Sequence, residues 1–392
     1  MIVAASELTA ITNARVVTPD AVRDDLAVCV RGGRIVDLVP HDQVGNARVI
    51  DLLGQHLLPG FVDTQVNGGG GKLFNDEPTA DTVRVLTRAH ARFGTTGLMA
   101  TLVSDDLSIV EKGRAAVDEA LKTGDRTIIG LHIEGPFINT ERRGVHDPDK
   151  IRRLTTAVAE KLQPLENGPT LITVAPETVE KGTIRSLVRK GFIVAAGHSA
   201  ANYDDIAAAV DEGLTGFTHL YNAMSQLTVR EAGVVGAALD LEQTYAGLIA
   251  DGVHVADASA RVALRCKGPD RLMLVTDAMP PVGTDLETFE LLGETVDVAN
   301  GICRDRRGAL AGSCLDMAMA VRRMMAMTGC DLVAAATMAA ATPARFLGLE
   351  RERGAIKPGL AADFAILDHE LQPVATITGG LTAWSKNEDP LH

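Results

Sequence analysis

Hydrophobic positions divide the middle of the chain into short apolar runs separated by longer amphipathic segments. The apolar runs have the length and composition of strands and lie at 57–66, 96–103, 127–134, 171–177, 192–199, 215–220, 246–255 and 272–278. Most precede segments with helical periodicity, such as 81–94, 106–124 and 204–213. Repeated β/α alternation with nearly all-apolar strands predicts an α/β fold, a (β/α)8 TIM-like barrel over residues 58–352. An open doubly wound sheet is the alternative, which the absence of a nucleotide-binding fingerprint disfavours.

Both ends of the chain follow a different pattern. Residues 8–18, 26–40 and 48–60 are short β-rich runs separated by Asn, Gly and Asp turns, and residues 355–368 and 372–380 resemble them. We therefore expect 1–57 and 353–392 to form one small β-sandwich, with the barrel inserted between them. Residues 283–313 read as an extra β-like insertion after the eighth strand. Helices near 315–328 and 331–341 then lead back to the small domain.

Composition and charge narrow the class of protein. Hydrophobic residues make up 46% of the 392 residues and aromatic residues only 3%, so the core is aliphatic. The net charge of −13 argues against nucleic acid or an anionic membrane as partner. No apolar run approaches the roughly 18 residues that span a bilayer, and the apolar start of the chain lacks the basic region of a signal peptide.

The cysteines point to a reducing compartment. There are five, none in a C-x-x-C pair, and an odd number suits free thiols in the cytoplasm. We expect them to be small buried hydrophobic residues rather than metal ligands.

Polar residues follow the predicted strands at the end where a parallel barrel carries its active site. They are Gln65 and Asn67, Glu134, His198, His219, Asp251 and His254, and Asp277. A single histidine at such a place is more often structural than functional. Three histidines at equivalent strand ends, His198, His219 and His254, favour a functional site.

These residue types suit a divalent metal. Two imidazoles and one carboxylate leave a coordination position for water, so we expect Glu134, His198 and His219 to bind the metal. Asp277 is the expected general base, with a helix N-cap as its alternative role. Other chemistries have less support: GGGGK at 68–72 is not a P-loop, and neither G-x-S-x-G nor H-E-x-x-H occurs.

A resemblance to a known family extends over nearly the whole chain. The segments that carry it are 59-PGFVDTQVNGGGG-71, 131-LHIEGPFIN-139, 144-GVHDP-148, 196-AGHSAA-201, 218-THLYNAM-224, 230-REAG-233, 250-ADGVHV-255, 275-VTDAM-279 and 357-KPGLAADFAIL-367. Together they resemble the amidohydrolase superfamily and, within it, the N-acetylglucosamine-6-phosphate deacetylases. The resemblance implies a barrel with a small β-sandwich, a homodimer, and hydrolysis of the N-acetyl group of a small-molecule sugar phosphate.

The resemblance also implies roles for individual residues. Glu134, His198 and His219 match the metal ligands, Asp277 the catalytic aspartate, and His146 a histidine that polarises the acetyl carbonyl. Arg230 and His254 match a phosphate-binding pair that can be completed across the dimer interface. The remaining substrate contacts are expected from Gln65, Asn67, Val145, Asn222, Ala223, Asp251, Leu310, Ala311 and Gly312. Ala311 stands where some relatives have serine, and main-chain contacts there can still hold substrate.

The amides Gln65 and Asn67 predict how many metal ions each subunit binds. They occupy the place where many amidohydrolases have a histidine pair for a second, deeper metal, and neutral amides are poor transition-metal ligands. We therefore expect one divalent ion per subunit: zinc first, with iron, cobalt or manganese as alternatives. Two other functions stay open: an amidohydrolase acting on a cyclic amide or a different N-acetylated amino sugar, and a non-catalytic barrel that serves as a scaffold.

Overall fold

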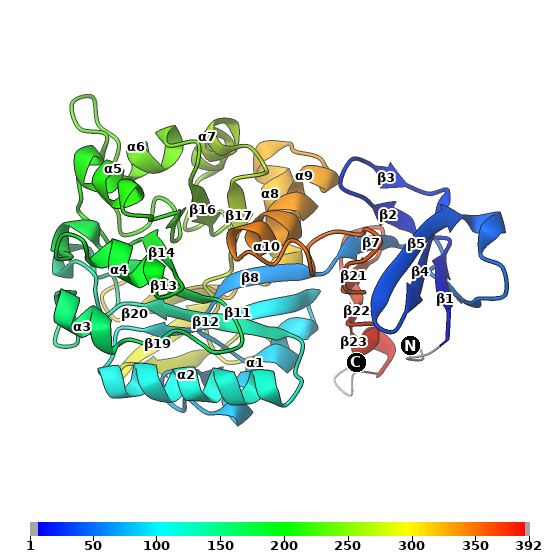
Figure 1. Ribbon diagram of the computed structural model, residues 1–392, viewed down its shortest axis with the longest axis horizontal. Helices are drawn as coiled ribbons and strands as arrows, with labels where there is room; N and C mark the ends of the chain where they lie inside the picture. Colours follow the sequence, from blue (N-terminus) through cyan, green and yellow to red (C-terminus); the bar gives the residue numbers. More distant parts are fainter. Residues whose placement is uncertain (1–6, 389–392) are drawn as a thin grey trace.

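The computed structural model describes residues 7–388 and consists of a barrel with a smaller β-structure beside it (Figure 1). Residues 1–6 and 389–392 lie outside the described residues. They include the start of the chain, where we expected no signal peptide, and the outer ends of the expected small domain. Within 7–388, no helix combines the length and the apolar character needed to cross a bilayer.

The barrel is built on one eight-stranded sheet in which every neighbouring pair of strands is parallel. Its strands, in spatial order, are β8 (Phe61–Val66), β11 (Thr95–Val103), β12 (Ile128–Glu134), β13 (Thr170–Val174), β14 (Phe192–Ala196), β15 (Gly216–Phe217), β16 (Tyr245–Leu248) and β17 (Leu272–Leu274). A parallel bridge between Val66 and Ala278 joins the first strand to the segment after the last. The sequence-based prediction of a barrel is confirmed.

Burial on both faces explains why these strands read as continuous apolar runs. All nine residues of β11 are buried, for example. One large cluster packs the outer faces of the strands against the helices. A separate cluster takes side chains from most barrel strands, among them Val62, Met99 and Met273, and closes on Phe346. This second cluster is the layer of inward-pointing side chains that fills a parallel barrel.

A helix follows each strand and covers the outside of the sheet (Figure 1). Those between strands are α1 (Ala80–Ala91), α2 (Leu107–Lys122), α3 (Thr156–Lys161), α4 (Thr183–Arg189), α5 (Tyr203–Asp211), α6 (Gly233–Asp240) and α7 (Asp257–Lys267). Local sequence sets several of their starts: Asn202 and Asp205 form a capping box at α5, and Thr79 caps α1. The expected helices at 81–94, 106–124 and 204–213 are confirmed as α1, α2 and α5.

The segment after β17 contains the predicted insertion and the helices that return to the small domain. Strands β18 (Thr288–Leu291), β19 (Glu294–Ala299) and β20 (Ile302–Asp305) form an antiparallel sheet. The helical part comprises α8 (Met317–Thr328), α9 (Leu332–Ala336), a π-helical turn (Thr337–Ala341) and α10 (Thr342–Phe346). The predicted β-like insertion at 283–313 and the predicted helices near 315–328 and 331–341 are therefore confirmed.

Two further sheets lie beside the barrel, and one of them combines strands from both ends of the chain. One has the order β5 (Arg34–Pro40), β4 (Leu26–Arg31), β1 (Thr9–Thr12), β6 (Arg48–Asp51). The other has the order β23 (Leu381–Ser385), β22 (Pro373–Thr378), β21 (Phe364–Leu367), β7 (His56–Pro59), β2 (Arg15–Val17), β3 (Val22–Arg23). In Figure 1 the red strands β21–β23 lie beside the blue strands β1–β7. One apolar cluster takes residues from both sheets, including Ile11, Val28, Phe364 and Ile377.

The division of the chain into a small domain (1–57 and 353–392) and a barrel (58–352) stays a prediction. β7 crosses residue 57, pairs with β2 and β21 in the small sheet, and leads through Gly60 into β8 of the barrel. The remaining elements are short: a hairpin of β9 (Gly68–Gly69) and β10 (Lys72–Leu73), and the 3-10 turns η1 (His41–Gln43), η2 (Thr140–Arg142), η3 (Pro176–Thr178) and η5 (Lys386–Glu388).

Candidate active site

The polar residues predicted at the strand ends converge at the carboxyl-terminal rim of the barrel. Glu134 is the last residue of β12, His198 follows β14, His219 follows β15 and Asp277 follows β17. Gln65 comes from β8 at the closing seam. Residues separated by more than 200 positions in sequence thus meet because parallel strands end on one side of the barrel.

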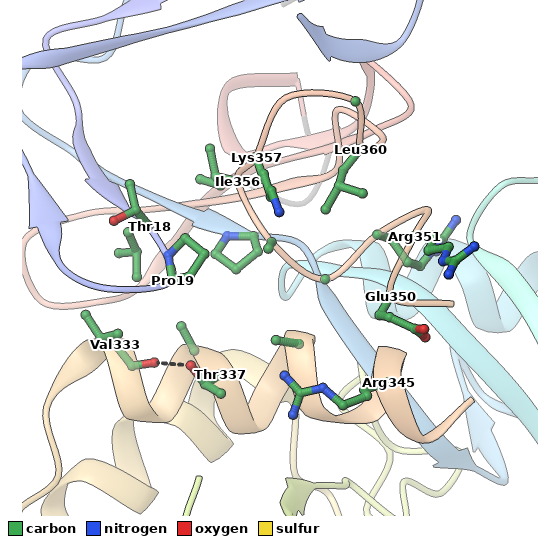
Figure 2. A pocket seen from close by; sticks show the side chains of 18 of the residues that line it. Thr18, Pro19, Val333, Thr337, Arg345, Glu350, Arg351, Ile356, Lys357 and Leu360 are labelled. Carbon is green, nitrogen blue, oxygen red and sulfur yellow. Dashed lines mark hydrogen bonds between the residues drawn. The ribbon is translucent and has the colours of Figure 1, made fainter. Parts of the chain in front are cut away.

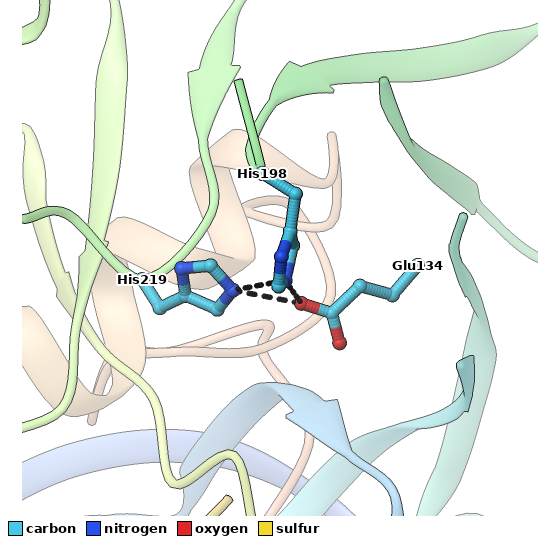
Figure 3. A group of neighbouring side chains, drawn as sticks. All are labelled: Glu134, His198 and His219. Atoms are coloured by element: carbon cyan, nitrogen blue, oxygen red, sulfur yellow. Dashed lines mark hydrogen bonds and ion pairs between the residues drawn. The ribbon is translucent and has the colours of Figure 1, made fainter. Parts of the chain in front are cut away.

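Three of these side chains form a compact cluster (Figure 3). Oε1 of Glu134 lies 2.9 Å from Nε2 of His219 and 3.3 Å from Nε2 of His198. The two Nε2 atoms are 3.0 Å apart. All three residues are buried, and among residues 7–388 they are the group of three whose ligand atoms could hold a metal ion.

The chemistry of these donor atoms fits a cation. Nδ1 of His198 lies 2.9 Å from the main-chain oxygen of Arg142, which can only accept, so Nδ1 carries the proton. Nε2 of a neutral His198 is therefore a lone pair aimed at the carboxylate of Glu134. Such an arrangement is repulsive unless a proton or a metal ion lies between the two atoms. Burial alone raises the pKa of Glu134, but when a proton lies between these atoms the hydrogen bonds from His198 and His219 bring that pKa well below its usual range.

The backbone is strained where it presents these side chains. His198, His219 and Asp277 have φ of 49°, 34° and 52°, in the left-handed region that residues with a Cβ rarely adopt. Gly197 must lack a side chain, because a Cβ there would lie 2.7 Å from Cγ2 of Thr173. Strain of this kind persists only where surrounding contacts enforce it, and it is concentrated at functional sites.

The amides of β8 and the loop after it contact the carboxylates. Nε2 of Gln65 donates to Oε1 of Glu134 at 2.8 Å and to Oδ1 of Asp277 at 3.1 Å. Nδ2 of Asn67 donates to the same Oδ1 at 2.6 Å. We expected both amides to contact the substrate. In the structure neither lines the cavity, and their partners are the carboxylates of the site.

Asp277 is arranged as a proton acceptor. Its Oδ1 receives both amides, and within residues 7–388 its Oδ2 accepts no hydrogen bond. Burial and the negative charge of Glu134 raise the pKa of Asp277, while the hydrogen bond from Asn67 acts to lower that pKa. One oxygen is therefore fixed and the other is available to a reacting molecule.

Asp63 fixes the backbone next to Asp277, a role that sequence reasoning missed. Its fully buried carboxylate accepts hydrogen bonds from Oγ1 of Thr276 at 2.5 Å and from the main-chain N–H groups of Gln65 and Thr276. Burial raises the pKa of Asp63 to about 7. An acidic residue two positions before Gln65 in an otherwise apolar strand was the signal that could have found it.

His146 is fixed in one tautomer. The main-chain N–H of Ser104 donates to its Nδ1 at 3.1 Å, and Oγ of Ser104 lies 2.7 Å from the same atom. Nδ1 is thus an acceptor, and the proton of the neutral ring is on Nε2. Burial, followed by the charge of His198, lowers the pKa of His146 to about 3. His146 is therefore a neutral hydrogen-bond donor at ordinary pH.

A cavity of about 340 Å³ opens above this cluster. The metal-binding group, His146 and Asp277 line it together with several predicted substrate residues: Val145, Asn222, Ala223, His254, Leu310 and Gly312. Sequence reasoning did not single out the lining residues Glu141, Arg142, Ile249 and Met279. Arg142 adds a cationic side chain to a site otherwise rich in carboxylates.

Three other predicted substrate residues lie away from the cavity wall. Asp251 accepts a 2.6 Å hydrogen bond from Nδ1 of His254 and so orients that ring. Ala311 is fully buried in the apolar cluster under the insertion. Arg230 is exposed on the loop before α6, next to Val229, which is 99% exposed. The fold of a single copy therefore does not place Arg230 in the cavity.

A larger cavity of about 490 Å³ lies between the barrel and the small domain (Figure 2). It borders Pro59 and Asp270, which precede β8 and β17, so it lies at the amino-terminal ends of the strands. Two of its guanidinium groups already have partners: Arg345 pairs with Asp270 at 3.3 Å, and Arg353 donates to the main-chain oxygen of Thr96. We therefore place the candidate active site in the smaller cavity, where the reactive groups converge.

Comparisons with known proteins find similar enzymes over most of the chain. The amidohydrolase family matches residues 56–389. A curated N-acetylgalactosamine-6-phosphate deacetylase from Shewanella sp. (strain ANA-3) is 43% identical, over 83% of this chain and 82% of the relative. An N-acetylglucosamine-6-phosphate deacetylase from Haemophilus influenzae is 33% identical, over 96% of this chain and 99% of the relative.

Solved structures resemble the fold over the same length. The crystal structure of N-acetylglucosamine-6-phosphate deacetylase from Pasteurella multocida superposes with a TM-score of 0.90 at 32% identity, covering 95% of this chain and 98% of that one. A mutant of the Mycobacterium smegmatis enzyme, in complex with N-acetyl-D-glucosamine-6-phosphate, has a TM-score of 0.89 at 30% identity, covering 97% and 100%.

Proposed function

Because this chain belongs to the amidohydrolase family, we propose that it hydrolyses the N-acetyl group of N-acetylglucosamine 6-phosphate, giving glucosamine 6-phosphate and acetate. The observation that carries the proposal is the convergence of Glu134, His198 and His219 with Asp277 in one cavity. The cavity volume, about 340 Å³, falls within the range of about 300–1,000 Å³ for small-molecule sites. Relatives named for this activity match nearly the full length of the chain.

Glu134, His198 and His219 would hold one divalent ion per subunit. We propose zinc, because two imidazoles and a carboxylate with an open position are a common catalytic zinc set, with iron, cobalt or manganese as alternatives. Such an ion, when bound, lowers the pKa of a coordinated water and polarises a carbonyl oxygen. The amides at Gln65 and Asn67 replace ligands for a second ion, so the expected count stays at one.

The remaining chemistry is assigned to the side chains around that group. Oδ2 of Asp277 takes a proton from the attacking water and returns it to the departing amine. Nε2–H of His146 donates to the carbonyl oxygen as negative charge develops there. Gln65 and Asn67 hold Oδ1 of Asp277, so that Oδ2 stays aimed at the reacting atoms. The buried carboxylate of Asp63 keeps the turn at Thr276 in register.

The sugar and phosphate would occupy the outer part of the cavity. Among the predicted substrate residues, Asn222, Ala223, His254, Leu310 and Gly312 line the cavity. His254 is directed by Asp251 and is the proposed phosphate contact. Arg230 is exposed and outside the wall of its own cavity. Its proposed contact with phosphate therefore needs a second copy of the chain, which supports a homodimer with the phosphate site near the interface.

Acetate release tests the activity directly. We expect rapid release from N-acetylglucosamine 6-phosphate by the metal-loaded enzyme and little from the unphosphorylated sugar. Arg230→Ala should raise KM for the phosphorylated sugar and leave the weak reaction of the free sugar unchanged. Equal losses on both substrates would count against the phosphate role, and absence of acetate release with every metal would favour the scaffold alternative.

A complementation experiment tests whether Arg230 acts across subunits. Arg230→Ala and Asp277→Asn should each be poorly active alone. If Arg230 serves the partner's site, unfolding and refolding the two variants together should produce mixed dimers with one intact site each. No recovery of activity in verified mixed dimers would assign Arg230 to its own subunit.

N-acetylgalactosamine 6-phosphate is a second candidate substrate, because the relative at 43% identity is named for it. The two sugars differ only in the configuration at C4, away from the amide and the phosphate. Comparing kcat/KM for the two epimers decides between them. A cyclic amide such as a dihydropyrimidine serves as the negative control for the wider family.

We further propose that the protein works in the cytoplasm. All five cysteines are free, in agreement with a reducing compartment. Fractionation of the native cell with detection of the protein would test this location.

A further inference from the structure

Two of the five free cysteines form a close pair beside the candidate active site. Cys303 lies on β20, and Cys314 lies in the segment between β20 and α8. Their Sγ atoms are 3.2 Å apart, and a disulfide bond length of about 2.05 Å requires them to approach by only about 1 Å. We infer that Cys303 and Cys314 form a reversible disulfide on exposure to a hydroperoxide, and that this bond lowers the activity of the neighbouring site.

The surroundings of the two sulfurs differ in a way that orders the chemistry. Cys303 is fully buried, whereas Cys314 is partly accessible. The hydrogen bond from Cys303 lowers the pKa of the Cys314 thiol and raises that of Cys303. The thiolate is the reactive form, so the accessible Cys314 reacts first and the buried Cys303 second.

The reaction consumes one hydroperoxide and two thiols. The Cys314 thiolate attacks the terminal oxygen, the O–O bond breaks, and the products are a sulfenic acid and an alcohol, or water when the oxidant is hydrogen peroxide. The Cys303 sulfur then attacks the Cys314 sulfur, the S–O bond breaks, and water leaves with the Cys303 proton. A dithiol reductant reverses the modification by exchange.

The pair is connected to the cavity wall by a short series of contacts. The N–H of Ala311 donates to the oxygen of Cys303 at 3.1 Å, and the neighbours Leu310 and Gly312 line the cavity. Ser313, next to Cys314, donates its N–H to the main-chain oxygen of Asp277 at 2.9 Å. Drawing the two sulfurs together therefore shifts the segment that shapes the cavity and supports Asp277.

The other cysteines serve as internal controls. Cys29 lies on β4, Cys266 on α7 and Cys330 before α9, and none of the three has a sulfur partner among residues 7–388. Cys266 is exposed and reachable by the same oxidant. Proximity rather than exposure thus selects the pair that becomes linked.

Peptide mapping tests for the bond without reference to activity. The full-length metal-loaded protein is treated with a small excess of hydrogen peroxide, blocked with iodoacetamide and digested with trypsin. Cys303 falls in peptide 272–304 and Cys314 in peptide 308–322, so the disulfide appears as a linked pair. We expect this pair, a fall in free thiols from five to three, and its disappearance after dithiothreitol. Absence of the linked pair, or linkage of other cysteines, overturns the inference.

The effect on the site is tested by acetate release, which rests on the proposed function. We expect wild type and Cys266→Ser to lose activity as the linked pair accumulates and to regain it with dithiothreitol. Cys314→Ser should resist, and Cys303→Ser should accumulate a sulfenic acid that dimedone traps. Equal inactivation of Cys314→Ser and wild type, or a disulfide without loss of activity, overturns the coupling. If the untreated protein releases no acetate, the proposed function fails, and the peptide map still tests the bond.

Discussion

Asn67 donates a 2.6 Å hydrogen bond to Oδ1 of Asp277 across the seam where the first and last barrel strands meet. Gln65 reaches the same oxygen and also Glu134. These amides therefore join the expected base to the expected metal carboxylate. They hold one carboxylate oxygen of Asp277 and leave the other oxygen available for reaction.

Removing the Asn67 amide should shift the pH profile. The hydrogen bond to the charged carboxylate lowers the pKa of Asp277, so Asn67→Ala raises that pKa. Since the base acts when ionised, the acidic limb of kcat/KM should move to higher pH. Acetate release measured across pH provides the test. Asn202→Ala removes an exposed helix-capping amide that does not line the cavity and should leave the limb in place.

Asp277→Asn should separate catalysis from metal binding. The variant keeps the shape of the side chain but cannot accept a proton, so kcat should fall by about 10²–10⁴-fold. Metal content by elemental analysis should be unchanged, because Asp277 is outside the group of three. Near-normal turnover would refute the assignment of the base.

Metal removal should abolish activity, and one ion per chain should restore it. Glu134→Gln should lower the bound stoichiometry, since the carboxylate faces both imidazoles. A ligand that binds only the folded state stabilises it, so adding zinc to the apoprotein should raise Tm for wild type more than for Glu134→Gln. His41→Gln, at a partly exposed histidine outside the barrel, is the control. Two tightly bound ions per chain would contradict the one-metal site.

His146 should remain neutral, with its proton on Nε2. Its Nδ1 accepts from the main chain at Ser104, and its pKa is lowered to about 3. The ¹⁵N shifts of His146 should therefore show a protonated Nε2 and no titration between pH 5 and 8. A histidine that titrates near pH 6.5 would remove the argument for a neutral donor.

Asp63 should make stability fall as pH rises. Its folded-state pKa, about 7, is above the usual value of 3.8, so the folded state binds more protons than the unfolded state between those values. The contribution of Asp63 is complete below about pH 4 and is lost as pH rises through 7. Asp63→Asn cannot ionise, so its Tm relative to wild type should increase from pH 4 to pH 8. A constant difference would show that Asp63 is charged throughout.

Local sequence determined much of the fold. The apolar runs marked every barrel strand, because a parallel strand buried on both faces has no solvent-facing positions to keep polar. Amphipathic periodicity located helices for a similar local reason, and the structure shows capping residues such as Thr79 and Asn202 at their starts. The order of polar residues at strand ends was enough to group Glu134, His198, His219 and Asp277, since the barrel places those ends on one rim.

Only the tertiary structure decided how these groups contact one another. Three such relationships depend on distances of about 3 Å between residues that are not neighbours in sequence. Gln65 and Asn67 bind carboxylates, Ser104 selects the tautomer of His146, and Cys303 meets Cys314. Such contacts follow from barrel closure and loop packing, which no local pattern encodes. Arg230 was grouped with the site by family resemblance alone, and the fold of one chain leaves its exposed side chain outside the cavity lining.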